Sequence, residues 1–198
     1  MLELFSDTGS VGKVAKEMGY TVVSLDRDMK ASIQVDIMDW DYTRFNPKLF
    51  DVVWASPPCT ARSRAKSRGD SDIDGLNEIV KRTLDILEYF QPKYWIIEHP
   101  PTGLLKDQPS MLGVPYNDID YCKYGMPYKK RTRLWNNLDL WKPKPLCFRN
   151  CGAMHETNNR YNQETDVYKV PTELIKEILL ACDLDAINAS DVEGDVVM

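Results

Sequence analysis

The chain has 198 residues, of which 43% are hydrophobic and 28% are charged, and its formal net charge is −5. This length and composition are typical of one folded domain with a sizeable core, and they exclude a chain too polar to fold. No apolar run approaches the roughly 20 residues of a transmembrane helix, and no basic segment precedes an apolar stretch at the start, so we expect neither a membrane span nor a secretory signal peptide. Five cysteines, an odd number, are typical here of reduced thiols, so we expect an intracellular location.

The negative charge is concentrated near the carboxyl terminus. Residues 183–198 hold five acidic residues and no Lys or Arg, so residues 1–182 balance with 25 basic and 25 acidic groups. The acidic composition of 183–198 predicts a disordered tail. Within the neutral remainder, basic side chains gather in the loops 60–68 and 129–133. Such loops can bind phosphate locally, although charge clusters are also common on solvated surfaces.

The first half of the sequence alternates short apolar runs with amphipathic segments. Apolar runs predict strands at 2–5, 21–25, 33–35, 51–55 and 94–97. Apolar residues at helical spacing predict helices at 9–19 and 71–90, and Ser71 with Asp74 forms a capping-box start for the second. This alternation is typical of βαβ units, so it predicts an α/β fold with a mostly parallel, doubly wound sheet covered on both faces.

The pattern is looser in the second half. Short strands are predicted at 118–124 and 133–135, and the segment 141–168 is irregular and rich in Pro, Asn and Cys. A final helix is predicted from Pro171 and Thr172, with Cys182 on its apolar side and therefore in the core. We expect residues 1–182 to form a single domain with a short Cys- and His-containing insert at about 141–168.

Polar residues follow almost every predicted strand. They are the turn Ser6–Gly9, Asp26, Asp36, Pro57 with its neighbours, and Glu98. Because the carboxyl ends of parallel strands meet at one edge of a sheet, we expect these groups to lie together. A Gly-containing turn before a helix suits an anionic ligand group, and an acid that ends the second strand suits ribose hydroxyls. The pattern predicts an enzyme with a nucleoside cofactor.

Five segments, in order and at compatible spacing, resemble motifs of the DNA cytosine-5 methyltransferase family. They are Leu4–Gly12, Ala55–Ser63, Trp95–Pro100, Lys129–Arg133 and Tyr168–Leu174. In the family these are the S-adenosylmethionine loop, the catalytic Pro-Cys loop, the strand with the glutamate, the Gln-x-Arg-x-Arg segment and the last motif. The resemblance extends over most of 1–182 and implies a Rossmann-like class I methyltransferase fold that takes S-adenosylmethionine as cofactor.

The resemblance also implies roles for individual residues in a catalytic site. Cytosine C5 is a poor nucleophile until a nucleophile adds to C6, and Cys59 would supply the thiolate. Glu98 would contact N3 and the 4-amino group, Arg133 the base carbonyl or a phosphate, and Arg131 would support the loop. A base inside a duplex is unreachable, so it must be flipped out, with loops 60–68 and 129–133 holding the DNA. The alternatives are a structural Cys59 and a Glu98 that only pairs with a basic neighbour.

For the cofactor, the family pattern places Asp26 on the ribose hydroxyls and Asp36 on the adenine amino group, with Ile37 beside it. Phe5 would pack against the methionine or adenine portion. Either acid could instead cap a helix or form a turn. The remaining expected cofactor contacts come from the first and fourth strand ends: Ser6, Asp7, Thr8, Gly9, Ser10 and Pro57.

Three residues depart from the family pattern. Asp7 stands where the family usually has Gly, His99 where it usually has Asn, and Lys129 where it usually has Gln. These departures keep open a relative that binds cofactor or nucleic acid without turnover. A cytosine-5 methyltransferase acting on RNA is a second alternative, and a thiol hydrolase that uses Cys59 and His99 is a third.

The family's large target-recognition region has no room here, because only about 35 residues separate Arg133 from Val170. The resemblance is therefore to compact phage and viral members. We expect target-sequence specificity to be short, absent or supplied by a partner. The same segment contains cysteines that, with Cys122 upstream, could make a tetrahedral zinc site, although the spacing is unusual and reduced, metal-free thiols are the alternative. The expected ligands are Cys122, Cys147, Cys151 and His155.

Overall fold

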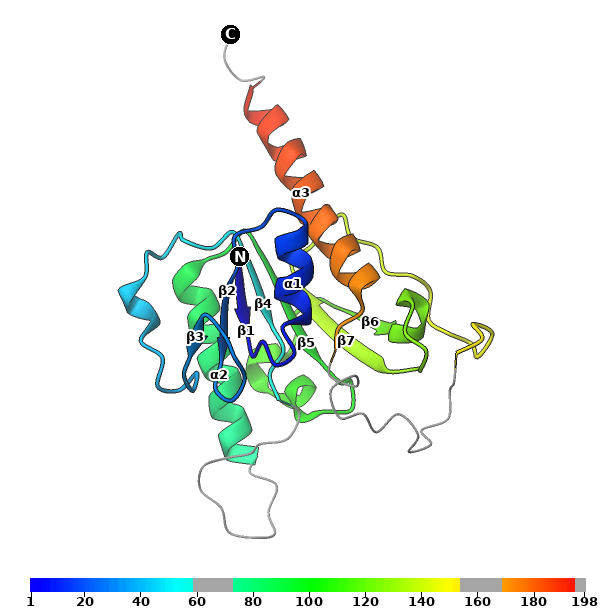
Figure 1. Cartoon of the computed structure of the whole chain (residues 1–198), viewed down its shortest axis with the longest axis horizontal. Coiled ribbons are helices and arrows are strands. Elements are labelled where there is room, and N and C mark those ends of the chain that lie inside the picture. Colours follow the sequence, from blue (N-terminus) through cyan, green and yellow to red (C-terminus); the bar gives the residue numbers. More distant parts are fainter. Residues whose placement is uncertain (59–72, 154–168, 195–198) are drawn as a thin grey trace.

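The computed structural model describes residues 1–58, 73–153 and 169–194 (Figure 1). Its centre is a seven-stranded sheet in the order β3-β2-β1-β4-β5-β7-β6. The first five strands run parallel, and β7 is antiparallel to both of its neighbours, β5 and β6. The strands are β1 (Leu2–Leu4), β2 (Val23–Asp26), β3 (Ile33–Gln34), β4 (Val52–Ala55), β5 (Tyr94–His99), β6 (Tyr116–Asp120) and β7 (Arg131–Asn136).

Helices cover both faces of the sheet. Helices α1 (Ser10–Glu17) and α3 (Thr172–Gly194) pack against each other on one face, and α2 (Ile73–Phe90) covers the other (Figure 1). Short 3-10 helices lie in the connections: η1 (Tyr42–Arg44), η2 (Leu104–Asp107), η3 (Pro109–Met111) and η4 (Tyr121–Tyr124). Within the described residues, no helix is long and apolar enough to cross a membrane.

The strands divide their side chains between two cores. In β4, Val52 and Trp54 pack with α1 and α3, whereas Val53 and Ala55 pack with α2. All four are buried, which is why this segment reads as a continuous apolar run and not as an alternating one. The prediction of a mostly parallel α/β sheet with helices on both faces is confirmed.

Several element boundaries differ from the sequence prediction. Strand β5 continues through His99, so Glu98 and His99 belong to the strand itself. The segment expected as one strand at 118–124 is the end of β6 followed by η4. Strand β7 is longer than expected because it pairs with β5 on one side and β6 on the other.

The last helix differs from the prediction of a disordered tail. Composition suggested a disordered tail from residue 183, but α3 continues to Gly194. No Gly or Pro interrupts residues 172–193, so the sequence contains no stop signal before Gly194. The Tyr20 hydroxyl donates hydrogen bonds to the Leu179 carbonyl and to the Asp183 carboxylate, which fastens the helix where the tail was expected to begin. Cys182 lies in the core, as predicted.

Candidate active site

The carboxyl ends of β1, β2, β4 and β5 meet at one edge of the sheet. Backbone hydrogen bonds join the loops that leave them: the Ser6 N–H donates to the Leu25 carbonyl and the Ser56 N–H to the Leu4 carbonyl. Because neighbouring parallel strands end at the same level, the polar residues predicted to lie together are positioned at this carboxyl edge.

The loop after β1 has an unusual backbone. Phe5, Asp7 and Gly9 adopt left-handed conformations, with φ of 60°, 40° and 67°. A Cβ added at Gly9 would meet no atom within 4 Å, so its glycine is needed for the dihedral angle and not for space. The positive φ at Asp7 explains why glycine suits that position, since left-handed backbone is costly for a residue with a side chain.

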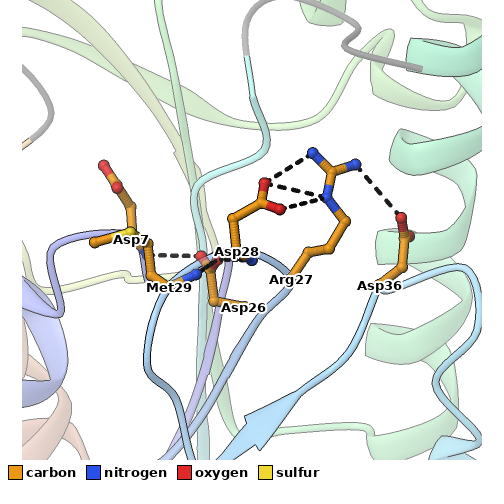
Figure 2. Close-up of polar contacts among 6 residues, drawn as sticks. All are labelled: Asp7, Asp26, Arg27, Asp28, Met29 and Asp36. Atoms are coloured by element: carbon orange, nitrogen blue, oxygen red, sulfur yellow. Dashed lines mark hydrogen bonds and ion pairs between the residues drawn. The ribbon is translucent and has the colours of Figure 1, made fainter. Parts of the chain in front are cut away.

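Asp26 holds the loops after β1 and β2 together (Figure 2). Its Oδ2 accepts the Asp7 N–H at 2.8 Å, and its Oδ1 accepts the N–H groups of Asp28 and Met29 at 2.9 Å each. Three backbone donors on one carboxylate make it a turn former, which was one of the two alternatives for this residue. The carboxylate stays at the edge where a ligand would reach it.

A second acidic group ends β3. Arg27 binds Asp28 through two nitrogens, and its NH1 atom lies 3.5 Å from Asp36 Oδ2 (Figure 2). Asp36 Oδ1 also accepts the Met38 N–H at 3.0 Å, and the neighbouring Ile37 is buried. Asp36 is therefore held in a fixed orientation two strands away from the loop after β1.

The other predicted cofactor residues lie along the loop after β1. Ser6 is buried, and Phe5, Thr8 and Ser10 are half-buried. Ser10 Oγ accepts the Val170 N–H at 3.2 Å, which joins the start of α1 to the segment that leads into α3. The last resembling motif thus returns to the loop after β1.

Asp7 places an acidic side chain with a raised pKa in the loop after β1. Burial and the nearby Asp26 raise the pKa of Asp7, and Lys130 counteracts the rise. The Asp7 side chain points away from the Asp26 carboxylate (Figure 2). A half-buried carboxylate therefore faces the same region as the start of β7.

Glu98 is buried near the end of β5 and has two described partners. The Tyr121 hydroxyl donates to Glu98 Oε1 at 3.0 Å, and Lys130 Nζ lies 3.6 Å from the same oxygen. Lys130 also sits over the Tyr121 ring, 4.8 Å from its centre. Burial and Glu98 raise the pKa of the Tyr121 hydroxyl well above its usual value, so Tyr121 remains a hydrogen-bond donor. The sequence analysis left Tyr121 out of the site and placed Lys130 only in the segment 129–133 that is expected to hold the DNA.

Arg131 and Arg133 do not lie beside Glu98. In the register of β5 and β7, Glu98 is opposite Leu134 and His99 is opposite Arg133, so the arginines project from the other face of the sheet. Each binds an aspartate of β6 through two nitrogens: Arg131 to Asp120 at 3.0 and 2.8 Å, and Arg133 to Asp118 at 2.7 and 3.0 Å. The matching two-residue spacings of the acids and the arginines were a sequence signal for this pairing.

His99 is fully buried beneath the turn that follows β5. Its Nδ1 lies 3.2 Å from the Pro100 carbonyl oxygen, and a Cβ added at Gly103 would come within 2.1 Å of its Cε1. Burial lowers the pKa of His99, with contacts to the carbonyls of Pro100 and Pro58 working in the opposite direction. A neutral imidazole therefore lies beside Pro58.

The loop after β4 is described only at its start. Pro57 is buried, and the Trp54 indole N–H donates to Ser56 Oγ at 3.3 Å. Cys59 and the basic loop 60–68 lie outside the described residues.

Three cysteines of the expected metal site come together. The Sγ atoms of Cys122, Cys147 and Cys151 all lie within 4.8 Å of one another, and those of Cys147 and Cys151 are 3.3 Å apart. Burial and the two neighbouring thiols raise the pKa of Cys122 to about 12. His155, the fourth expected ligand, lies outside the described residues.

No family model matches the chain. Among solved structures, a candidate DNA modification methyltransferase encoded within an E. coli prophage matches with a TM-score of 0.53 and 17% identity, covering 74% of this chain and 51% of that chain. This chain thus spans about half the length of that structure, and the likeness shows a shared fold. A Frog virus 3 (isolate Goorha) protein named "Probable DNA (cytosine-5)-methyltransferase" is 34% identical over 216 residues, covering 92% of this chain and 99% of the viral protein. The chain belongs to the DNA (cytosine-5)-methyltransferase family.

Proposed function

We propose that the chain transfers a methyl group from S-adenosylmethionine to C5 of cytosine in DNA, through a covalent adduct with Cys59. The family supplies the reaction class. The observation that carries the proposal for this chain is Glu98, a buried carboxyl group at the carboxyl edge with Tyr121 and Lys130 at one of its oxygens. It is the group that this reaction needs beside the pyrimidine.

The edge residues fit the proposed cofactor. Asp26 and Asp36 offer carboxylate oxygens for ribose hydroxyls and an adenine amino group, and both are oriented by backbone N–H groups. The half-buried Phe5, in the neighbouring loop after β1, offers an apolar surface. The residues that would hold S-adenosylmethionine are Phe5, Ser6, Asp7, Thr8, Gly9, Ser10, Asp26, Asp36, Ile37 and Pro57. When bound, the cofactor supplies an electrophilic methyl group.

Cys59 and Glu98 would carry the covalent chemistry on the pyrimidine ring. The Cys59 thiolate adds to C6, and the electron pair of the C5–C6 bond moves into the ring toward N3, where Glu98 provides a proton. C5 would then take the methyl group, and the donor would leave as the neutral thioether S-adenosylhomocysteine. Loss of the C5 proton to solvent and expulsion of the thiolate restore the aromatic ring, with the N3 proton returning to Glu98. Tyr121 and Lys130 both approach Oε1, so Oε2 is the oxygen that would face N3.

DNA would reach the carboxyl edge through the basic segment 129–133 and the loop 60–68. Because the target base is inaccessible in a duplex, the nucleotide must be extruded, and basic side chains would hold the flanking phosphates. Lys130 and Arg131 project from opposite faces at the start of β7, so Lys130 would act near the base and Arg131 nearer the backbone. The insert is too short to form a separate base-reading domain, so any long target sequence would need a partner.

A DNA duplex with 5-fluorocytosine tests the mechanism, because fluorine at C5 prevents release of the enzyme. With methyl donor, the wild-type chain and a Cys182→Ala variant should form a covalent complex, and a Cys59→Ala variant should not. Cys182 is the matched control because it is a core thiol on α3. Absence of both the complex and any 5-methylcytosine product would overturn the proposal. An RNA substrate of the same sequence is the second arm, and product only on RNA would reassign the polymer.

A binder without turnover is the second candidate, and Asp7 favours it. A carboxylate in the loop after β1 would face the cofactor's own carboxylate, and its raised pKa shows that the charge is already disfavoured there. Calorimetric binding of S-adenosylmethionine together with no methylated product would select this candidate.

We also propose that Cys122, Cys147 and Cys151 hold a structural zinc ion, with no part in methyl transfer. His155, four residues after Cys151, remains the predicted fourth ligand. Purified under reducing conditions, the wild-type chain and the Cys182→Ala variant should contain about one zinc per chain by mass spectrometry, and Cys151→Ser should contain far less. Equal metal content in both variants would contradict this assignment. Cobalt substitution should give the intense visible bands of a tetrahedral thiolate site.

A further inference from the structure

The segment Cys147–Cys151, which we call the thiol loop, exposes an aromatic ring to solvent. Phe148 is 84% exposed, more than any other large hydrophobic side chain in the described part of the chain. Its neighbour Arg149 is also exposed. A phenylalanine with this exposure contributes little burial to the core, and its ring is available for contact with a partner.

The thiol loop is firmly held at its base. The Cys147 N–H donates to the buried Asp120 carboxylate at 2.9 Å, and Lys129 Nζ donates to the Cys147 carbonyl at 3.2 Å. The sulfur atoms of Cys147 and Cys151 close the loop, and Cys122 anchors them to η4. Phe148 therefore projects from an anchored loop.

The contacts of the thiol loop lead directly to the candidate active site. Asp120, which accepts from Cys147, binds Arg131 and precedes Tyr121 in the chain. Tyr121 donates to Glu98. Lys129, which donates to Cys147, precedes Lys130, the cation beside Glu98. The thiol loop thus contacts Asp120 and Lys129, the sequence neighbours of the two residues that approach Glu98.

The charge around Phe148 suits a polyanion. Residues 141–151 contain three basic side chains and no acidic one: Lys142, Lys144 and Arg149. Lys144 pairs with Glu173 and Glu177, and the four basic residues of the neighbouring segment 129–133 pair with Asp118, Asp120 and Glu98, so Lys142 and Arg149 are the cations that carry this argument. An aromatic ring among cations is the combination with which proteins bind nucleic acid, since the ring stacks on bases and the cations contact phosphates.

We infer that the thiol loop is a DNA-contact element, in which Phe148 stacks on a base next to the extruded cytosine and Arg149 contacts a flanking phosphate. This inference rests on the proposed function for its choice of DNA. A ring inserted at the base step would fill the space that the flipped nucleotide leaves, as apolar wedges do in other DNA complexes. The insert is too short to form a separate DNA-binding domain, and the thiol loop would supply part of the missing DNA contacts.

The test compares Phe148→Ala with Phe148→Trp and with Leu112→Ala. Leu112 is the matched control because it is also a highly exposed apolar side chain, 69% accessible, and it precedes the start of β6, away from the carboxyl edge. The full chain is titrated, in reductant and with zinc present, into a fluorescein-labelled cytosine-containing duplex, and affinity is read from anisotropy. Calorimetry with S-adenosylmethionine and metal analysis serve as readouts that Phe148 should not change.

Phe148→Ala should weaken DNA binding by about tenfold, the size expected for one lost base–aromatic stack. Phe148→Trp should restore affinity to within about twofold because it can stack equally well. Leu112→Ala should bind DNA like the wild type. Unchanged affinity of Phe148→Ala would overturn the inference, as would a loss that Leu112→Ala reproduces. A loss seen only with RNA of the same sequence would overturn the choice of DNA.

These outcomes are independent of catalysis. If the wild-type chain forms no 5-methylcytosine but Phe148→Ala still loses DNA affinity, the proposed reaction fails and the contact element stands. If methylation occurs at the wild-type rate in Phe148→Ala with unchanged DNA affinity, the reaction stands and the contact element fails.

Discussion

Asp7 combines two features that a glycine at the same position would remove. Its backbone φ of 40° is in the left-handed region, and its carboxyl group is half-buried near Asp26, which raises its pKa. Aspartate tolerates this region better than most residues do, yet the conformation still costs free energy that glycine does not incur. The carboxylate also lies where the family's cofactor loop has only backbone.

We therefore expect Asp7→Gly to stabilise the fold and to tighten cofactor binding. Relief of left-handed strain should raise the unfolding free energy by about 0.5 to 1 kcal/mol, measured by urea denaturation. Removal of the charge should increase the affinity for S-adenosylmethionine several-fold in calorimetry. Asp7→Asn separates the two effects, because it removes the charge and keeps a side chain. Weaker cofactor binding by Asp7→Gly would show instead that the carboxylate is a ligand.

The buried Glu3 should make the stability of the fold depend on pH, because its pKa is raised. It is buried in β1 facing α1, where its Oε1 accepts the Gly12 N–H at 3.0 Å, and burial raises its pKa to about 7. The native state therefore holds a proton that the unfolded chain releases between about pH 4.5 and 7. Stability contributed by the neutral form should fall as pH rises through this window.

Glu3→Gln removes this titration and keeps an oxygen that can accept the Gly12 N–H. At pH 8 the variant should exceed the wild type in unfolding free energy by about 1 to 2 kcal/mol, and near pH 4.5 the two should be similar. Urea denaturation at both pH values measures the difference. A variant less stable than the wild type at pH 8 would mean that the charged Glu3 is favoured in the fold.

For single residues, the sequence predicted which side chains lie at the carboxyl edge better than it predicted which residues they contact. Asp26, Asp36 and Glu98 were identifiable because each ends an apolar run, and the structure positions all three at the carboxyl edge. The contact of Lys130 with Glu98 was not identifiable, because it depends on which residue of β7 lies opposite Glu98. A shift of one residue in that register would exchange the faces of Lys130 and Arg131.

The hairpin of β6 and β7 contains two ion pairs in different surroundings. Asp120 has a fully buried side chain that also accepts the Cys147 N–H, whereas the Asp118 side chain is 27% exposed. Although burial opposes it, hydrogen bonds from Arg131 and Cys147 lower the pKa of Asp120. Arg133 has a second partner in the Tyr116 ring, 3.6 Å away.

Asp120→Asn should therefore cost more stability than Asp118→Asn. We expect about 2 to 4 kcal/mol for the buried pair and about 0.5 to 1 kcal/mol for the exposed one, by urea denaturation. The contribution of Asp120 should be present at neutral pH and disappear as the pH falls through its lowered pKa, so the two variants should converge in acid. Equal losses at pH 7 would contradict the assignment of burial as the cause.

The turn after β5 fits closely over His99. A Cβ at position 103 would lie 2.1 Å from His99 Cε1 and 2.6 Å from Nδ1. Gly103→Ala should therefore displace the imidazole and destabilise the fold by about 1 to 3 kcal/mol, as overpacking does. Adding His99→Asn, a smaller side chain, should recover part of that loss. Additive losses in the double variant, measured as unfolding free energies, would show that the two positions do not compete for space.

At the scale of elements, periodicity predicted the parallel strands and the long helix α2 from local pattern alone. It was wrong where distant contacts or absent stop signals decide the boundary. β7 is extended by pairing on both of its sides, and α3 continues because Tyr20 of a distant segment holds Asp183. Composition was a poor guide to the second case, since acidic residues suit a helix as well as a disordered chain.

At the scale of the whole molecule, the far part of α3, which holds acidic residues and no basic one, lies away from the basic segment 129–133. The basic segment 129–133 lies at the carboxyl edge, where the Ser10–Val170 hydrogen bond also sets the start of α3. From there α3 runs for 23 residues, about 34 Å, and its far end projects beyond the opposite edge of the sheet (Figure 1). Four of the five excess negative charges therefore belong to residues 183–194 of α3, away from the proposed DNA site.

Deletion of residues 185–198 tests whether position or net charge governs DNA binding. It removes four acidic residues and no basic one, which changes the formal charge from −5 to −1. At physiological salt, where charges are screened beyond about 8 Å, we expect DNA affinity to change by less than about twofold. At 0.01 M salt the screening length is about 30 Å, comparable with the length of α3, so the truncated chain should bind more tightly. The deletion keeps Asp183 and the core residues of α3, so thermal unfolding should confirm an intact fold. A large gain in affinity at physiological salt would show that the acidic end of α3 lies close to the DNA.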